Sequence, residues 1–363
     1  MEGNKIILFM KTLFKNKYMN FITIKKGGKK QMRKMMLSLI MLMIILAGCQ
    51  NSADGGGVTE LRLAHNQPLD HPVHLSLMEF GRLVEEKSNN KIKVKIFANG
   101  QLGSEREVIE LTQTGAVDVA KVSASALEGF ESDYSIFSLP YVFESYEKFQ
   151  ETMSKKEVTD KVYKQTEDIG FIGLTYYNAG VRNLYTKEKE VMTPADMAGL
   201  KVRVQPSQTS VKMIEALNGT PTPMAYGEVY TALQAGVIDA AENNESALVS
   251  NNHGEVAKSY MYTEHQIVPD ILIMNAEKLN KFSEDEQAII YEAAAESTKY
   301  HEGVWNKTIK EVKDIAANEM GVRFIEVDKE PFIEAVKPMH EEYMENEKTK
   351  DIYQLIKGAE ENE

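Results

Sequence analysis

Two stretches of the chain follow one pattern: REVIELTQTGAVDVA at residues 106–120 and GEVYTALQAGVIDAA at residues 227–241. At a constant offset of 121 residues, Glu, Val, Gln, Gly, Asp and Ala recur in register. Each copy has the apolar spacing of a helix, then a glycine, then an apolar run typical of a buried strand. Two copies of one unit predict two similar lobes.

The segments around the two copies also alternate between strand and helix patterns. LRLAH (61–65) and KIKVKIFA (91–98) have the apolar alternation of strands. KVKI (93–96) precedes the first copy and KVRV (201–204) precedes the second, so we expect these two segments to be equivalent strands. The alternation predicts an α/β fold with buried sheets.

The C-terminal part has a largely helical pattern. FSEDEQAII places Ser283 in an N-cap position and Glu286 three residues later, which is the spacing of a capping box. Helical periodicity continues from there towards Met320. A helix of this length is long enough to run along both lobes.

The repeat also predicts where a ligand would bind. Clefts between domains are favoured small-molecule sites, and ligands of open α/β sheets lie beyond the carboxyl ends of the strands. The cleft should therefore be lined by the residues that follow the second strand of each copy, namely Lys121 and Ser123 in one lobe and Glu242, Asn243 and Asn244 in the other. We expect His65, at the end of an earlier strand, to reach the same cleft.

Arginine is rare in this chain, which has seven arginines and 35 lysines. Arg182 in YYNAGVRNLY (176–185) and Arg203 in GLKVRVQPS (199–207) both fall in the second lobe. A planar guanidinium group holds a carboxylate through two hydrogen bonds. We therefore expect a carboxylate partner, either a ligand or an acidic side chain.

The N-terminal 48 residues have the features of a signal peptide. MRKMMLSLIMLMIILAGC (32–49) combines a basic start with an apolar run that is too short to span a bilayer comfortably. Its last four residues resemble the lipobox of bacterial lipoproteins, in which the cysteine, here Cys49, carries the lipid. We expect translation to begin at Met32, so that residues 1–31 are a mis-assigned start, and residues 49–57 to be a flexible tether between lipid anchor and folded body.

The composition of the exported part excludes several functions. Residues 49–363 contain 32 basic and 53 acidic side chains, a formal charge of −21, which repels nucleic acid and anionic lipid. Cys49 is the only cysteine, so a disulfide within the chain is impossible. His65, His71 and His74 lie in a loop-like stretch without a completing cysteine or carboxylate set, so we expect no metal site.

Several stretches together resemble the solute-binding proteins of TRAP transporters, the DctP-type family. The resemblance is carried by LRLAHNQPLDHPVH (61–74), QLGSERE (101–107), NAGVRNLYT (178–186), DMAGLKVRVQPS (196–207) and GTPTPMAYGEVYTALQAGVIDAAENN (219–244). It covers nearly all of residues 58–345. It implies a two-lobed, periplasmic-binding-protein-like fold with a ligand cleft between the lobes and one long helix spanning both.

In that family the lobes close over an organic acid and deliver it to a sodium-coupled membrane permease. The resemblance therefore implies a binding protein without a cofactor or catalytic residues. It places lobe I at residues 58–179 plus 269–308, and lobe II at residues 180–268 plus 309–363. It also implies roles for six residues: Arg182 as main carboxylate anchor, Arg203 as second anion contact, Asn243 as further ligand contact, Glu105 and Ser123 as contacts to the rest of the solute, and Tyr226 as an aromatic cleft residue.

Acidic side chains at the cleft help to choose among organic acids. A carboxylate repels a second ligand carboxylate but accepts hydrogen bonds from hydroxyl groups. Glu105 and Glu242, with His65 and Asn243, therefore favour a sugar acid such as a uronate or aldonate over a C4-dicarboxylate. Lys121 should either contact the ligand or pair with one of these two glutamates.

Two other functions are alternatives on the sequence alone. Glu105 and Glu242 could be the acid/base pair of a sugar-acid enzyme, although no nucleophile motif, metal set or phosphate loop accompanies them. A ligand sensor would use the same closing cleft but would dock on a receptor instead of a permease.

Overall fold

The structure, a computed structural model, describes residues 57–361. The predicted signal peptide, Cys49 and nearly all of the predicted tether lie outside these residues. From Val58 onwards the chain forms one compact unit. Within the described range, every helix is either too short or too polar to cross a lipid bilayer.

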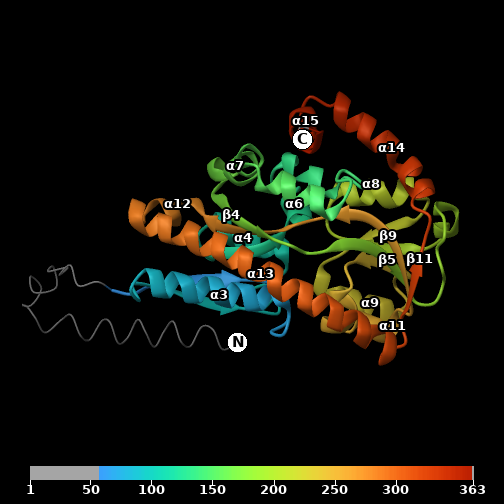
Figure 1. Cartoon of the computed structure of the whole chain (residues 1–363), viewed down its shortest axis with the longest axis horizontal. Helices are drawn as coiled ribbons and strands as arrows, with labels where there is room; N and C mark the ends of the chain where they lie inside the picture. The colour runs from blue at the N-terminus through green and yellow to red at the C-terminus, as the bar shows by residue number, and fades with distance from the viewer. Residues whose placement is uncertain (1–56, 362–363) are drawn as a thin grey trace, which may run out of the picture. The chain divides into compact units, whose positions relative to one another are not determined.

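Two sheets form the framework, and helices cover them (Figure 1). The first sheet has the order β2-β1-β3-β10-β4, with β1 (Thr59–Ala64), β2 (Ile92–Phe97), β3 (Val119–Ser123), β4 (Phe171–Tyr177) and β10 (Asp270–Asn275). The second has the order β11-β9-β5-β8-β6-β7, with β5 (Val181–Thr186), β6 (Lys201–Val204), β7 (Thr220–Pro223), β8 (Ala240–Asn243), β9 (Ser259–Ile267) and β11 (Arg323–Glu326). The predicted α/β class with two lobes is confirmed.

The helices of the first lobe region are α3 (Pro72–Lys87), α4 (Glu105–Gln113), α5 (Ala124–Leu127), α6 (Tyr146–Ser154), α7 (Lys156–Lys164) and α12 (Ala276–Asn280). Those beside the second sheet are α8 (Gln208–Ala216), α9 (Val229–Ala235), α10 (Ser246–Ser250) and α11 (His253–Val256). The C-terminal helices are α13 (Glu284–Asn318), α14 (Glu330–Glu345) and α15 (Lys350–Glu361).

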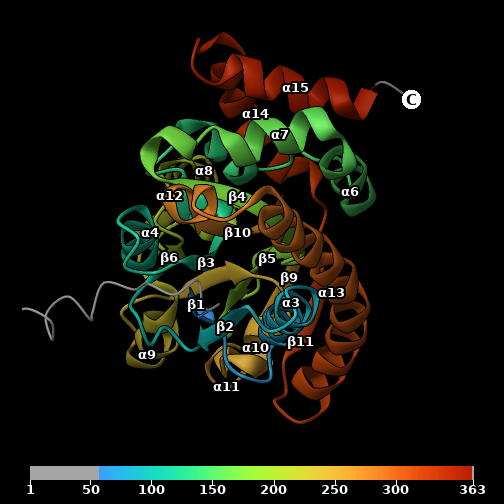
Figure 2. The ribbon, with the colours of Figure 1, turned by 90° about the vertical axis from the view of Figure 1, so that its left-hand side faces the viewer.

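The long helix α13 connects the two lobes. It begins at the predicted capping box, in which the Ser283 side chain accepts from the Glu286 N–H and the Glu286 side chain accepts from the Ser283 N–H. It then packs against α3 and β4 of the first lobe and against α10 of the second (Figures 1 and 2). The prediction of a helix that spans both lobes is confirmed.

The repeat has the same structure in both lobes. Helices α4 and α9 are followed by glycines with positive φ, 73° at Gly115 and 72° at Gly236. Asp118 then accepts a 2.8 Å hydrogen bond from the backbone N–H of Arg62 in β1. Its counterpart Asp239 accepts a 2.9 Å bond from the N–H of Lys201 in β6. The strands that follow, β3 and β8, run parallel to β1 and β6 respectively.

One equivalence expected from the sequence is wrong. KVRV is β6, which lies beside β8, and the strand in the same place beside β3 is β1. KVKI lies in β2, whose counterpart at the edge of the other sheet is β7. The two segments look alike because a short alternation of basic and apolar residues suits both an edge strand and its neighbour.

Two short crossovers connect the sheets. The chain passes from Tyr177 in β4 to Val181 in β5, and it returns from Ile267 in β9 to Asp270 in β10. The first crossover is held to α13, because His301 Nε2 lies 2.8 Å from the carbonyl oxygen of Asn178. The long helix therefore holds the first of the two crossovers in place.

Among the polar contacts between the lobes, two are related to each other by the repeat. His71, the N-cap of α3, places Nε2 3.1 Å from Ser246 Oγ in α10. Ser207, the N-cap of α8, donates its hydroxyl to Glu128 at the end of α5, and Thr209 N–H donates to the same carboxylate at 3.0 Å. Helices α3 and α8 are counterparts, as are α5 and α10, so each lobe contributes one N-cap and one short helix.

The C-terminal helices extend over both lobes. Helix α14 packs on α8 and β9, whereas α15 packs on α6 and α7 (Figure 2). Lys357 Nζ in α15 donates to the carbonyl oxygen of Val142 at 3.1 Å. These contacts differ from the expectation that all of residues 309–363 belong to lobe II, and we propose that α15 belongs with lobe I, because α6 and α7 lie there. We retain the other lobe boundaries as a proposal.

The turn of the repeat requires glycine at Gly236, because φ is positive there. Gly236→Ala should destabilise the protein by about 1–2 kcal/mol, because a φ of 72° places a side chain in the left-handed region. Equilibrium unfolding in urea measures the loss. Gly227→Ala is the matched control, since a Cβ there meets no atom within 4 Å and φ is not positive. Equal losses in the two variants would contradict the argument.

Candidate functional site

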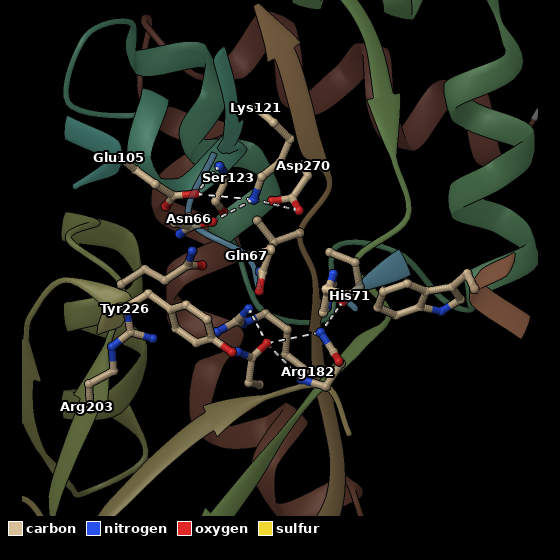
Figure 3. A pocket seen from close by; sticks show the side chains of 16 residues that line it. Asn66, Gln67, His71, Glu105, Lys121, Ser123, Arg182, Arg203, Tyr226 and Asp270 are labelled. Atoms are coloured by element: carbon tan, nitrogen blue, oxygen red, sulfur yellow. Dashed lines mark hydrogen bonds and ion pairs between the residues drawn. The ribbon is translucent and has the colours of Figure 1, made fainter. Parts of the chain in front are cut away.

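A polar cavity lies where the carboxyl ends of strands from both sheets approach each other (Figure 3). Seven of the nine predicted binding residues line it: Glu105, Lys121, Ser123, Arg182, Arg203, Tyr226 and Asn243. The other two, His65 and Glu242, are buried but do not belong to the lining.

Arg182 and Glu242 form a buried ion pair. Arg182 Nε lies 2.5 Å from Glu242 Oε2, and Nη2 lies 2.9 Å from Oε1. Nη2 also donates to the carbonyl oxygen of Glu242, and Nη1 donates to Asn243 Oδ1 at 3.0 Å. The pair arises because β5 and β8 are antiparallel neighbours, with Asn183 opposite Asn243. Glu242 is therefore committed to Arg182, which corrects the expectation that it faces the ligand.

The charge of Glu242 is stabilised by this pairing. Burial alone would raise the pKa of Glu242, but the charge of Arg182, the nearby His265 and the hydrogen bonds from Arg182 lower it to about 2. His265 Nε2 lies 3.5 Å from Glu242 Oε2. Glu242 thus stays ionised at neutral pH and neutralises Arg182.

Arg203 has no acidic partner among residues 57–361. Its Nε and Nη2 donate to the carbonyl oxygen of Met224 at 3.2 and 3.0 Å, and its guanidinium carbon lies 5.7 Å from the centre of the Tyr226 ring. The residue is 2% exposed. Burial lowers the pKa of Arg203, and the charge of Arg182 lowers it further although Glu242 opposes both. The cavity wall therefore contains a buried cation that is not neutralised by a direct contact.

Lys121 connects three side chains of the opposite cavity wall. Its Nζ lies 3.0 Å from Asp270 Oδ2, 3.1 Å from Asn66 Oδ1 and 3.6 Å from Glu105 Oε1. The predicted pairing with Glu105 is present, whereas Glu242 pairs elsewhere. Burial raises the pKa of Glu105 and the charge of Asp270 adds to the rise, while Lys121 and the Ser123 N–H oppose it.

His65 is buried next to the cavity lining but is not part of it. Its Nε2 lies 3.0 Å from His74 Nδ1, and its Nδ1 accepts a 3.1 Å hydrogen bond from the backbone N–H of Gln67. Burial, then the charges of Lys121 and His74, lower the pKa of His65 to about 3, so the ring is neutral at neutral pH. The expectation that His65 lines the cleft is not met, because the two residues after it take that place.

The remaining lining includes seven residues with polar or aromatic side chains: Asn66, Gln67, His71, Gln205, Asn244, Asp270 and Trp305. Asn244 was expected and the other six were missed. The rule used for β3 and β8, applied also to β1 and β6, would have found Asn66, Gln67 and Gln205. Asp270 begins a strand, and it reaches the same edge only because β10 is antiparallel to β3.

The three histidines of residues 65–74 do not come together in the structure. His65 contacts His74, but His71 turns towards Ser246 in the other lobe. Across residues 57–361, no group of three or more His, Cys, Asp or Glu side chains is arranged to hold a metal ion.

The fold and the cavity define the class of this protein. Two α/β sheets joined by crossovers, with a polar cavity lined from both, are the architecture of a two-lobed solute-binding protein. The model of the DctP family, described as bacterial extracellular solute-binding protein, family 7, matches residues 63–347. The chain belongs to this family, which acts outside the cytoplasm, and the resemblance is confirmed.

Individual relatives agree with this assignment. Protein YiiZ of Salmonella typhimurium, described as uncharacterized, is 40% identical over 303 residues, covering 84% of this chain and 92% of that protein. A TRAP periplasmic solute-binding protein from Anaerococcus prevotii, with bound α/β-D-glucuronate, has a TM-score of 0.81 and 41% identity, covering 84% of this chain and 98% of that chain. Another from Bradyrhizobium sp., in complex with α/β-D-galacturonate, has a TM-score of 0.80 and 34% identity, covering 84% of this chain and 100% of that chain.

The buried histidines give the protein a defined pH dependence. Burial is the largest cause that lowers the pKa of His65, His253 and His301, to about 3, 3 and 4. In the unfolded chain these pKa values are about 6.5, so below that pH the unfolded state binds more protons. The stability that these neutral rings contribute is complete above about pH 6.5 and is lost as the pH falls towards 4.

Urea unfolding at pH 7.5 and at pH 5.0 measures this loss. The free energy of unfolding should be lower at pH 5.0, and His301→Gln, which removes one titrating ring, should make the difference smaller. A difference that His301→Gln leaves unchanged would remove this ring from the explanation.

Proposed function

We propose that this protein is the lipid-anchored, extracytoplasmic solute-binding component of a TRAP transporter, and that its solute is a sugar acid such as a uronate or aldonate. The observation that carries the proposal is Arg203, a buried guanidinium group in the cavity wall without an acidic partner among residues 57–361. A buried charge is costly unless it is paired, so this wall favours an anionic ligand.

Arg203 is better suited than Arg182 to be the main anchor. Arginine has five N–H donors. The carbonyl oxygen of Met224 takes two of those on Arg203 and leaves three. Arg182 has given four to Glu242 and Asn243, which leaves one on Nη1. Arg203 is therefore the proposed main carboxylate anchor and Arg182 a secondary contact, which is the reverse of the roles that the resemblance implied.

The strength of such a site can be estimated. Charge-assisted hydrogen bonds contribute roughly 1.5–3 kcal/mol each, and a carboxylate accepts two from one guanidinium group. A micromolar complex requires about 8 kcal/mol after the costs of association. The carboxylate anchor supplies part of this, and contacts to the rest of the solute must supply the remainder.

Support for a sugar acid comes from the lining and from the relatives. The cavity is lined mainly by amide, carboxylate and cationic side chains, which suit a solute with many hydroxyl groups. The similar proteins from Anaerococcus prevotii and Bradyrhizobium sp. hold hexuronates. A C4-dicarboxylate is the alternative within the same family. The enzyme alternative loses support, because Glu242 is bound by Arg182 and does not line the cavity.

The two-lobed cavity supports a role in transport. Since both lobes line it, a bound solute would favour their closed arrangement. The closed protein would then be the form that the TRAP permease subunits accept. A ligand sensor would use the same closure, and the receptor or permease partner would distinguish the two.

Calorimetry with D-glucuronate and D-galacturonate tests the proposed function. The unmodified protein should bind at least one of these acids with micromolar or lower Kd, and Arg203→Lys should weaken binding at least tenfold, because lysine keeps the charge but loses the fork. Arg182→Lys is the comparison, and it should lower the free energy of unfolding more than Arg203→Lys does. Near-unchanged affinity in Arg203→Lys would remove this residue from its role.

The lipid anchor is tested separately. We propose that Cys49 becomes the lipid-modified first residue of the mature protein. In cells, Cys49→Ser should move the protein from the membrane fraction to the soluble fraction and abolish incorporation of labelled palmitate. Retention of the serine variant in the membrane fraction would show that another element anchors the chain.

A further inference from the structure

The lobe I wall of the cavity presents acceptors that other side chains leave free. Gln67 Oε1 is buried and receives no hydrogen bond from any residue of the described range. Glu105 accepts from the Ser123 N–H through Oε1, and Asp270 accepts from Lys121 through Oδ2. The second oxygen of each carboxylate has no hydrogen bond within residues 57–361. Figure 3 shows Glu105 and Asp270 on the side of the cavity away from Arg203, and Gln67 between the two sides.

Lys121 adds no free donor to this wall. Its three N–H groups face Asp270, Asn66 and Glu105, and the residue is 1% exposed. Two carboxylates around one ammonium group leave an excess of one negative charge. Lys121 therefore acts as a positioning residue that fixes the two acids, and an anionic group would meet them rather than its charge.

The repeat explains why the two walls differ. Lys121 and Glu242 occupy equivalent positions of the repeat, 121 residues apart. Lys121 lies beside two carboxylates, whereas Glu242 contacts one guanidinium group and lies near a second. In lobe I, one lysine faces Glu105 and Asp270, which leaves negative charge in excess. In lobe II, Glu242 pairs with Arg182 and leaves Arg203 without an acidic partner, so positive charge is in excess. The cavity therefore has a positive wall and a negative wall.

We propose that the acceptor wall, formed by Gln67, Glu105 and Asp270 and held by Lys121, selects solutes with a single carboxylate and a polyhydroxylated remainder, and excludes dicarboxylates. Hydroxyl groups donate to the free acceptor oxygens, whereas a second carboxylate meets the like charge of Glu105 and Asp270. This inference rests on the proposed function, because it assumes that Arg203 holds the solute's carboxylate. It separates uronates and aldonates from aldarates and C4-dicarboxylates.

Calorimetry with D-glucuronate, D-gluconate and D-glucarate tests the inference on the unmodified protein. D-glucarate has the carbon chain of D-gluconate with a second carboxylate in place of the terminal hydroxymethyl group. The tighter of the two monocarboxylates should bind at least tenfold more tightly than D-glucarate. Equal or tighter binding of D-glucarate would overturn the inference and leave the proposed sugar-acid function standing. Failure of all three acids to bind would overturn both.

Three variants locate the selectivity. Asp270→Asn removes one negative charge beside Lys121, and it should shift the affinity ratio at least tenfold towards D-glucarate. Asp160→Asn is the matched control, because Asp160 also pairs with lysines, Lys156 and Lys164, but lies on α7 outside the cavity lining. It should leave the ratio unchanged.

Gln67→Met keeps the side-chain size and charge but deletes the free acceptor. It should weaken monocarboxylate binding about threefold to tenfold, the loss of one neutral hydrogen bond. This variant keeps the inference falsifiable if Asp270→Asn does not fold. Unchanged affinity in Gln67→Met, or an unchanged ratio in a folded Asp270→Asn, would show that this wall does not determine the selectivity between monocarboxylates and dicarboxylates.

Discussion

The buried ion pair between Arg182 and Glu242 determines the polarity of the cavity. Glu242 lies near two guanidinium groups but contacts only one of them directly, so Arg203 is left as the cation of the lobe II wall. Without Arg182, the carboxylate would be available to neutralise Arg203 and the preference for an anion would be lost. Without Glu242, two buried cations would face each other unpaired, which is strongly unfavourable.

The same ion pair lies close to the first crossover between the sheets. Arg182 lies in β5, the strand that the chain enters directly after the first crossover, and Glu242 lies in the neighbouring strand β8. Helix α13 fixes that crossover through His301 and, one turn later, contributes Trp305 to the cavity lining. The residues that would sense a solute and the segment that would bend are thus parts of one packed unit.

The sequence predicted those features that depend on local pattern. The repeat predicted two lobes, and the position of residues after β3 and β8 predicted much of the lining, because strand ends of one sheet share an edge. The capping box at Ser283 predicted the start of α13, because both of its partners lie within one helical turn.

The features that the sequence did not predict depend on pairing between distant segments. Whether Glu242 serves Arg182, Arg203 or the ligand is decided by the antiparallel register of β5 and β8. Asp270 reaches the cavity because of the direction of β10, which no local pattern reveals. The contact of α15 with lobe I depends on the path of the chain after α14.

The two contacts between the lobes that the repeat relates differ in chemical kind. Glu128 carries a charge and accepts hydrogen bonds at the N-terminus of α8, where the helix dipole favours an anion. His71 meets Ser246 as a neutral imidazole, because burial first of all holds its pKa well below the usual range. Of these two contacts, the one at Glu128 is charge-assisted and the one at His71 is neutral. A duplicated unit thus joins its two lobes through contacts at equivalent places that use different chemistry, a charged carboxylate in one and a neutral imidazole in the other.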